Sequence, residues 1–322
     1  MKKIWLVIPC YNEEEVLNET ARRTAELMKD MMSRGKISKN SKIAFVNDGS
    51  KDRTLEIIRK LCEEDNIFVS INLSRNRGHQ NALLAGLMTA KKYADAAISL
   101  DADLQDDIGV IENFIDEFEK GSDIVYGVRN ERKKDTFFKK FTAEAFYKFM
   151  KLMGVDIVFN HADYRLMSKR ALDGLSEFDE VNAFLRGIVP QIGYPSSIVE
   201  YSRDKRFAGE SKYPLKKMLA FAAEGITSFS VRPIRMAFLL GFLSFLVSIV
   251  MLGYCFIEHI LGNTVSGWAS LSVSIWAIGG LQMLMLGIVG EYIGKIYLET
   301  KHRPKYIIES VILNEEDDDK EV

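Results

Sequence analysis

The sequence predicts an α/β fold, a mostly parallel sheet flanked by helices, followed by a pair of helices long enough to span a membrane. Two observations lead to this prediction. Short apolar, β-rich runs alternate with segments of helical periodicity up to Tyr126, which is typical of βαβ units around a parallel sheet. Two long runs without a charged residue then follow in the last third of the chain. The 322 residues leave room for one large domain or two ordinary ones.

The order of elements follows from where each apolar run begins and ends. The first run, Ile4–Ile8, is too short for an export signal and is followed at once by Tyr11 and acidic residues, so it is interpreted as a strand. The turn Asp48–Thr54 contains Asp and Ser residues that can cap the helix after it. Strands are expected at Ile4–Ile8, Ile43–Val46, Phe68–Leu73, Ala96–Leu100 and Ile124–Tyr126, and helices at Glu14–Met32, Arg53–Glu63, Gln80–Lys92 and Val110–Glu119.

The composition argues against several classes of protein. The formal net charge is -2 and no basic stripe is present, which argues against a nucleic-acid partner. The three cysteines, Cys10, Cys62 and Cys255, lie far apart, so they indicate neither a zinc site nor a disulfide framework and fit a reducing, cytosolic environment. No glycine-rich dinucleotide or P-loop motif follows the first strand, which disfavours a Rossmann site and a P-loop.

Two carboxylates follow the strand expected at Ala96–Leu100. Asp101 and Asp103 are two residues apart, so on an extended backbone their side chains point to the same side. Paired oxygen ligands of this kind can hold Mg²⁺ or Mn²⁺ together with substrate phosphates, although a solvated acidic turn is the alternative. The segments Tyr11–Glu13 and Asn47–Ser50 also follow strands. Because ligands of parallel sheets bind beyond the carboxyl ends of the strands, one edge is expected to collect all these residues.

The two uncharged runs, Met236–Ile257 and Trp268–Gly290, are each long enough to cross a bilayer core of about 30 Å as a helix. The connector Glu258–Gly267 contains no Lys or Arg, whereas basic residues lie on the outer flanks. The positive-inside rule therefore predicts that both termini and the large N-terminal domain are cytosolic. A buried helical hairpin in a soluble protein is the alternative. The flanking basic residues are Arg232, Arg235, Lys295, Lys301 and Arg303.

Three motifs occur in order, each after an expected strand: Ile8–Glu14, Asn47–Thr54 and Asp101–Gln105. This ordered set resembles glycosyltransferase family 2, whose members have the GT-A fold. Four later segments are similar to the polyprenyl-phosphate branch of that family, in particular to members with two membrane helices that glucosylate bactoprenol phosphate. These segments are Asp163–Ser168, Gly209–Tyr213, Glu224–Ser230 and Gly290–Tyr297.

The resemblance implies roles for individual residues. Asp101 and Asp103 match the nucleotide- and metal-binding Asp-x-Asp of the family, and Gln105 lies where some members add a metal contact. Asp163 aligns with the residue proposed as catalytic base. A lipid phosphate is already mostly dianionic at neutral pH and needs no base, so a positioning role for Asp163 is favoured. The family binds the nucleoside at the positions of Pro9, Tyr11, Glu13 and Asp48. Relatives often have Lys at the position of His79. In relatives a basic loop closes over the phosphates, and here that loop contains Arg203, Arg206 and Lys212.

The activity implied by the resemblance is metal-dependent, inverting transfer of a hexose onto undecaprenyl or another polyprenyl phosphate at the bacterial cytoplasmic membrane. Glucose from UDP-glucose is the expected donor, Mg²⁺ or Mn²⁺ the expected cofactor, and a homotetramer the expected assembly. A processive polysaccharide synthase is an alternative, although the Gln-x-x-Arg-Trp motif of such synthases is absent. A catalytically dead membrane scaffold is a second alternative, which intact Asp101, Asp103 and Asp163 disfavour.

The expected organisation is a cytosolic GT-A catalytic domain over residues 1–231, two transmembrane helices over 232–296 (about 236–257 and 268–290), and a cytosolic acidic tail over 297–322. Two segments of the catalytic domain, Thr136–Met153 and Tyr213–Phe229, combine aromatic residues with lysines and are candidates for helices at the lipid interface.

One departure from the family concerns Asp107. Many relatives have Pro at this position, so the loop conformation after Gln105 is left open.

Overall fold

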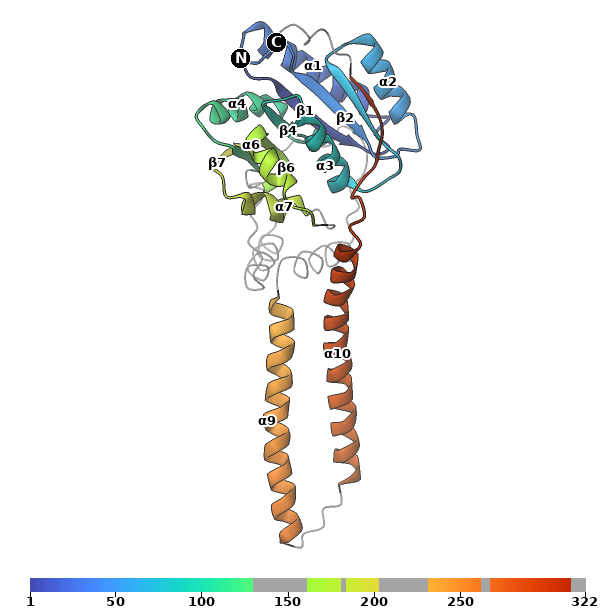
Figure 1. The fold of residues 1–322 in the computed structure, drawn as a ribbon, viewed down its shortest axis with the longest axis vertical. Coiled ribbons are helices and arrows are strands. Elements are labelled where there is room, and N and C mark those ends of the chain that lie inside the picture. Colours follow the sequence, from blue (N-terminus) through green and yellow to red (C-terminus); the bar gives the residue numbers. More distant parts are fainter. Residues whose placement is uncertain (130–160, 181–183, 203–230, 262–266, 314–322) are drawn as a thin grey trace. The chain divides into compact units, whose positions relative to one another are not determined.

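The computed structural model describes residues 1–129, 161–180, 184–202, 231–261 and 267–313 (Figure 1). The chain divides into two compact units. The sheet unit comprises Met1–Glu144, Ile157–Tyr213 and Pro304–Val322, and the hairpin unit comprises Ala145–Asp156 and Pro214–Arg303. The chain therefore leaves the sheet unit, passes through the hairpin unit and returns to the sheet unit at Pro304.

The sheet unit is built on one eight-stranded sheet with the order β7-β5-β6-β4-β1-β2-β3-β8. β1 pairs in parallel with β2 and β4, and β2 pairs in parallel with β3, so the carboxyl ends of these four strands meet at one edge. β1 and β3 are buried along their whole length, as expected for central strands covered on both faces. The strands are β1 (Ile4–Cys10), β2 (Lys42–Asn47), β3 (Phe68–Leu73), β4 (Ala96–Ser99), β5 (Ile124–Arg129), β6 (His161–Ser168), β7 (Ser196–Tyr201) and β8 (Ile308–Ile312).

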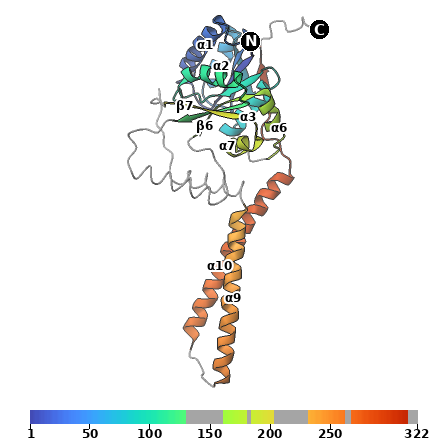
Figure 2. The same cartoon turned by 90° about the vertical axis from the view of Figure 1, so that its left-hand side faces the viewer.

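Helices cover both faces of this sheet (Figure 2). Successive residues of β1 point to opposite faces. Leu6 belongs to the large core that includes residues of α1, α2 and α4, whereas Val7 lies against α3. The helices are α1 (Leu17–Ser33), α2 (Thr54–Glu64), α3 (His79–Ala90), α4 (Ile111–Glu119), α6 (Lys169–Ser176) and α7 (Leu185–Ile188), with short 3₁₀ turns η1 (Ile108–Val110) and η2 (Val189–Ile192).

Gly86 marks a close approach of α3 to the sheet. A Cβ at this position would lie 2.4 Å from Val7 Cγ1 and 2.6 Å from Val46 Cγ2. We therefore expect Gly86→Ala to lower the free energy of unfolding by about 1–3 kcal/mol, because the packed core must shift to admit a methyl group. Denaturant unfolding of the purified protein measures this change. Val7→Ala frees space beside Gly86, so the double variant should lose less stability than the sum of the single variants; strict additivity would contradict the contact.

Three strands and their places in the sheet were not predicted from the sequence. β6 lies antiparallel between β4 and β5, β7 pairs in parallel with β5, and β8 pairs antiparallel with β3. β8 corrects the expectation that residues 297–322 form only an acidic tail, since α10 continues to Thr300 and residues 308–312 belong to the sheet. The pairing of β8 with β3 joins segments far apart in the chain, and local periodicity carries no information about such a partner.

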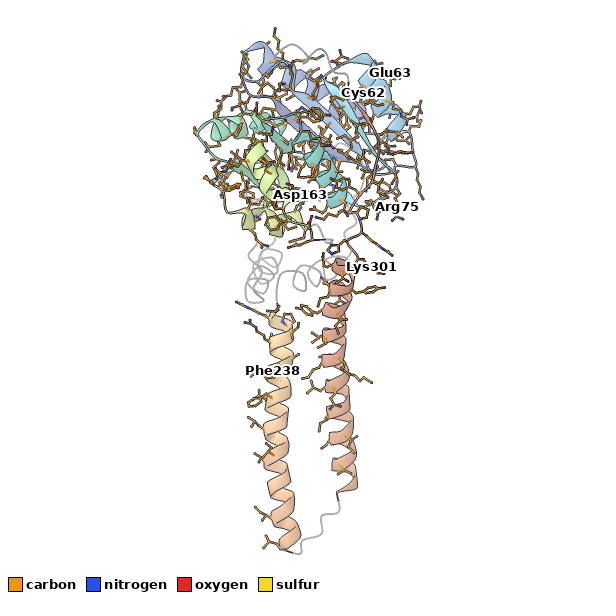
Figure 3. The ribbon with its side chains drawn as sticks, viewed as in Figure 1. Cys62, Glu63, Arg75, Asp163, Phe238 and Lys301 are labelled. Carbon is orange, nitrogen blue, oxygen red and sulfur yellow. The ribbon has the colours of Figure 1, made fainter. Side chains whose placement is uncertain are left out.

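The hairpin unit contains two long helices, α9 (Arg232–Ile260) and α10 (Trp268–Thr300), which include both uncharged runs of the sequence. Large apolar side chains are exposed along them; Phe238 on α9, labelled in Figure 3, is 75% exposed and Met283 on α10 is 73% exposed. Within the described part of the chain, one stretch, Ala277–Thr300, is long and apolar enough to cross a membrane, and none of its most apolar window is buried. An apolar surface of this extent indicates contact with lipid or protein.

Candidate active site

The antiparallel strand β6 brings Asp163 to the edge where β4 ends. Ser99, the last residue of β4, pairs with Arg165 of β6. In this register Asp163, two residues before Arg165, lies beside Asp101, two residues after Ser99. The Ser99 hydroxyl donates a hydrogen bond to the Asp163 carbonyl and so fixes the two strands at this point. Asp163 and Asp101 therefore meet at one edge of the sheet.

Asp163, labelled in Figure 3, is almost completely buried. It is held by three side chains from different elements. Arg165 Nη2 donates to Asp163 Oδ1 at 2.7 Å. Arg186 of α7 donates from Nε to Oδ1 at 3.1 Å and from Nη2 to Oδ2 at 3.0 Å, a bidentate pair. Gln80 of α3 donates to Oδ2 at 3.0 Å. Burial alone would raise the pKa of Asp163, but Arg186 and Arg165 outweigh it and hold this pKa well below its usual range.

Asp101 lies in a different electrostatic environment. Its side chain is 31% exposed, and its Oδ1 is 3.5 Å from Nε2 of His79, which is also 3.8 Å from Asp163 Oδ2. Burial and, to a smaller extent, the neighbouring carboxylates of Asp163, Asp106 and Asp103 raise the pKa of Asp101 to about 6, against the opposing effect of His79. The pKa of Asp101 is therefore raised, whereas that of Asp163 is lowered.

The loop after β4 has a strained backbone directly after the Asp-x-Asp segment. Leu104 has a φ of 54°, a left-handed conformation that is uncommon for a branched apolar residue. The Asp103 Oδ1 accepts a hydrogen bond from the backbone N–H of Gln105 at 3.2 Å, which closes a turn around Leu104. Backbone strain of this kind is concentrated at binding and catalytic sites.

The structure shows the loop conformation at Asp107, the position at which a proline was expected from the family resemblance. Its φ is -65°, which is the value that a proline ring imposes, and its carboxylate accepts from the backbone N–H of Gly109 at 2.8 Å. Asp107 thereby caps the short helix η1 with a φ that a proline could also adopt.

The loops after β1 and β2 are joined by hydrogen bonds. Asn12, with a φ of 56°, accepts from the backbone N–H of Lys51 at 2.9 Å, and the N–H of Glu13 donates to the Thr54 hydroxyl at 2.9 Å. Tyr11, between these contacts and the end of β1, is 43% exposed. The two motifs therefore form one rigid rim that presents Tyr11, while Pro9 is buried within β1.

Asp48 is 2% exposed, and both of its carboxylate oxygens are used within the protein. Oδ1 accepts from the N–H of Arg77 at 2.6 Å and Oδ2 from the N–H of Gly78 at 2.9 Å. Asp48 thus fixes the loop that leads into α3 and His79. The next residue, Gly49, has a φ of 65°, and a Cβ there would lie 2.5 Å from the backbone nitrogen of Asn76, so glycine is required at this position.

The family model described as glycosyl transferase family 2 matches residues 5–175. The chain belongs to glycosyltransferase family 2. A second model, described as the GtrB C-terminal hairpin, matches residues 232–296. The two matches cover β1 to β6 of the sheet and most of the two long helices of this glycosyltransferase, and they confirm the family and fold class expected from the sequence.

Relatives match the glycosyltransferase over nearly its whole length. An uncharacterized glycosyltransferase, YkoT, from Bacillus subtilis (strain 168) is 53% identical and covers 97% of this chain and 92% of its own. The prophage bactoprenol glucosyl transferase homolog of Escherichia coli (strain K12) is 41% identical, covering 96% of this chain and 99% of its own. The bactoprenol glucosyl transferase of Shigella phage SfV is also 41% identical, with 96% and 98% covered.

The candidate active site of the glycosyltransferase offers a divalent cation only some of the ligands that it needs. Among the residues that the structure describes, no group of three or more His, Cys, Asp or Glu side chains could hold a metal ion. Mg²⁺, however, is commonly bound by one or two carboxylates and completed by substrate phosphates and water. Asp101 and Asp103 offer such a pair of carboxylate oxygen ligands. Gln105, the third expected ligand, is buried at 7% exposure.

Several residues of the site were missed by sequence reasoning. Arg165 lies within the Asp163–Ser168 motif, and its spacing of two residues from Asp163 on a strand was a usable signal. Arg186 and Gln80 come from other elements and carried no local signal. Three expected phosphate-binding residues, Arg203, Arg206 and Lys212, lie outside the described residues, as do the segments 136–153 and 213–229.

Proposed function

We propose that this glycosyltransferase transfers glucose from UDP-glucose to undecaprenyl phosphate at the bacterial cytoplasmic membrane. The observation that carries the proposal is the match to bactoprenol glucosyl transferases over both the catalytic domain and the hairpin, at 41% identity. A lipid phosphate cannot leave the bilayer, so a transferase acting on it benefits from an apolar hairpin that holds it there. A tetrameric assembly is part of the same proposal.

In this proposal the carboxyl edge of the sheet binds the nucleotide sugar. The exposed ring of Tyr11 offers an apolar face to the base, and Glu13 lies next to it on the rim that Asn12 and Thr54 hold in place. Asp48 acts indirectly, since its carboxylate orders the loop before α3. Asp101 and Asp103 would hold Mg²⁺ or Mn²⁺, which supplies Lewis acid stabilisation of the charge on the departing diphosphate.

Asp163 positions groups in this proposal and does not remove a proton. A general base works best when its pKa lies near the operating pH, and the arginines hold the pKa of Asp163 far below that. A phosphate monoester has a second pKa near 6, so the acceptor already carries its negative charge at neutral pH. Arg186 is 33% exposed in its side chain, and Asp163 holds its guanidinium at the site edge. A single displacement by the lipid phosphate would invert the configuration at the sugar.

The orientation in the membrane can be tested by cysteine labelling. In a Cys255→Ala background the remaining cysteines, Cys10 and Cys62, are buried. We expect a cysteine introduced at Asn263 to react with an impermeant reagent added outside intact cells, and one at Ser310 to react only after the cells are opened. The opposite pattern would overturn the proposed topology, in which the termini are cytosolic.

The proposed activity is tested with purified protein, undecaprenyl phosphate and a panel of UDP- and GDP-sugars in the presence of Mg²⁺ or Mn²⁺. The expected result is a glycolipid heavier than the acceptor by one hexose, formed only from UDP-glucose. Transfer from another donor would correct the sugar, and repeated addition to one lipid would indicate a processive synthase. Absence of product with every donor would contradict the proposal.

A further inference from the structure

The sheet unit has a cavity at the edge opposite the candidate active site. It has a volume of about 470 Å³ and lies among the amino ends of the parallel strands, where Lys3 precedes β1, Lys42 begins β2 and Ile67 precedes β3. Because the candidate active site lies at the carboxyl ends of the same strands, the two regions are on opposite edges of the sheet. The cavity therefore takes no part in the proposed transfer reaction.

The lining of this cavity is strongly basic. Among the described residues that line it, Asp65 is the one acidic residue, and it pairs with Lys29. The aromatic wall is rigid, since the rings of Trp5 and Tyr93 stack with centroids 5.4 Å apart and planes 6° apart. The lining thus has a fixed wall and an excess of four positive charges from five lysines and one aspartate. The five lysines are Lys3, Lys29, Lys39, Lys42 and Lys92.

The chain itself leads an acidic segment to this cavity. β8 runs antiparallel to β3, and Ile312 at its end pairs with Ser70 near the amino end of β3. The next residue, Leu313, lines the cavity. The sequence after it, Asn314–Val322, contains six acidic residues and one lysine. At about 3.3 Å for each extended residue, the carboxylates of residues 315–319 can reach across the cavity from Leu313.

We infer that the lysine cavity is a carboxylate-binding site and that its occupant is the acidic segment Glu315–Asp319 of the same chain. The charges are complementary, and the tether at Leu313 gives the segment a local concentration of about millimolar or more. A single exposed ion pair contributes little, so binding requires several carboxylates and lysines together. The docked segment holds β8, the strand that follows the hairpin, against the edge of β3.

Carbodiimide cross-linking of the full-length protein, followed by peptide mass spectrometry, tests this inference. We expect amide bonds from residues 315–319 to the cavity lysines, above all Lys39 and Lys92. The double variant Lys39→Glu/Lys92→Glu should reduce the remaining links to the cavity about fivefold or more. The matched control Lys60→Glu/Lys120→Glu reverses two exposed lysines elsewhere and should leave them unchanged. Salt at about 1 M should also remove the links, since it shortens the screening length to roughly 3 Å.

Hydrogen exchange of the β8 amides provides a second readout. Neutralising the segment with Glu→Gln and Asp→Asn changes at residues 315–319 should accelerate this exchange about fivefold, whereas the Lys60→Glu/Lys120→Glu control should not. Cross-links spread evenly over lysines far from the cavity would overturn the inference. In an equal mixture of isotope-labelled and unlabelled protein, cross-links that join the two isotopic forms would also overturn it, because the occupant would then be a second copy. Neither readout depends on the sugar or lipid substrate, so failure here is distinguishable from failure of the proposed activity.

Discussion

Replacing Asp103 with alanine should reduce sugar transfer by at least about 100-fold while the protein remains folded. Loss of a group that stabilises developing charge in a transition state commonly costs about 10²–10³-fold in rate. Asp103 lies in the strained turn around Leu104, beside Asp101, and offers one of the two carboxylates available for a cation. The measurement is the initial rate of glycolipid formation, with thermal unfolding of the same preparation as the test of folding.

Asp107→Ala is the matched control for this variant. Asp107 lies in the same loop and caps η1, so its loss should cost about 1 kcal/mol of stability and leave the rate within about threefold of wild type. Binding of Mn²⁺ in the presence of UDP, followed by electron paramagnetic resonance, should weaken in Asp103→Ala and not in Asp107→Ala. A wild-type rate for Asp103→Ala, or full activity of the wild-type protein in excess EDTA, would remove the metal site from the proposal.

Asp163→Asn should have the second large effect, a loss of about 100-fold in rate. Asparagine removes the charge that balances Arg165, which is 1% exposed, and that holds Arg186 in its bidentate geometry. Removing one partner of a buried ion pair typically costs roughly 3–5 kcal/mol of stability, and asparagine retains part of the hydrogen bonding. The free energy of unfolding should therefore fall measurably in the same variant.

The pH dependence separates a positioning role from a base. The pKa of Asp163 is lowered in the folded protein. The stabilisation that the ionised Asp163 provides is therefore complete above the pKa of Asp in the unfolded chain, roughly 4, and it is lost only as the pH falls below that value. Asp163 therefore does not titrate between pH 5.5 and 8.5, and wild type and Asp163→Asn should show the same rise in rate through about pH 6 as the acceptor ionises. A rise in wild type that is absent in Asp163→Asn would favour the base.

Much of the sheet unit could be predicted from the chain because its central part is built from local patterns. β1 to β4 are short apolar runs, and α1 to α4 have helical periodicity, so both element type and order were visible. The places of β6, β7 and β8 could not be predicted in the same way. Each joins the sheet through a partner distant in sequence, and periodicity identifies a strand without identifying what it pairs with.

Those residues of the candidate site that directly follow predicted strands could be placed from the sequence. Asp101 and Asp103 lie at the carboxyl edge as the alternation of strands and helices required, and Asp163 joins them through β6. The state of Asp163 was not predictable, because it depends on Arg186 and Gln80, which approach from α7 and α3. Asp48 likewise has two backbone partners that no spacing rule indicates.

The return of the chain to β3 has a consequence for biosynthesis. Asn72 of β3 donates a hydrogen bond to Glu309 of β8, across 237 residues of sequence that include the whole hairpin. On the ribosome, β3 is made long before β8, so the sheet keeps an open edge until both long helices have been synthesised. An open edge can pair with other chains, which is a recognised route to aggregation. A soluble fragment ending before Arg232 would keep that edge for its whole lifetime, whereas one that carries residues 304–313 on a short linker would close it.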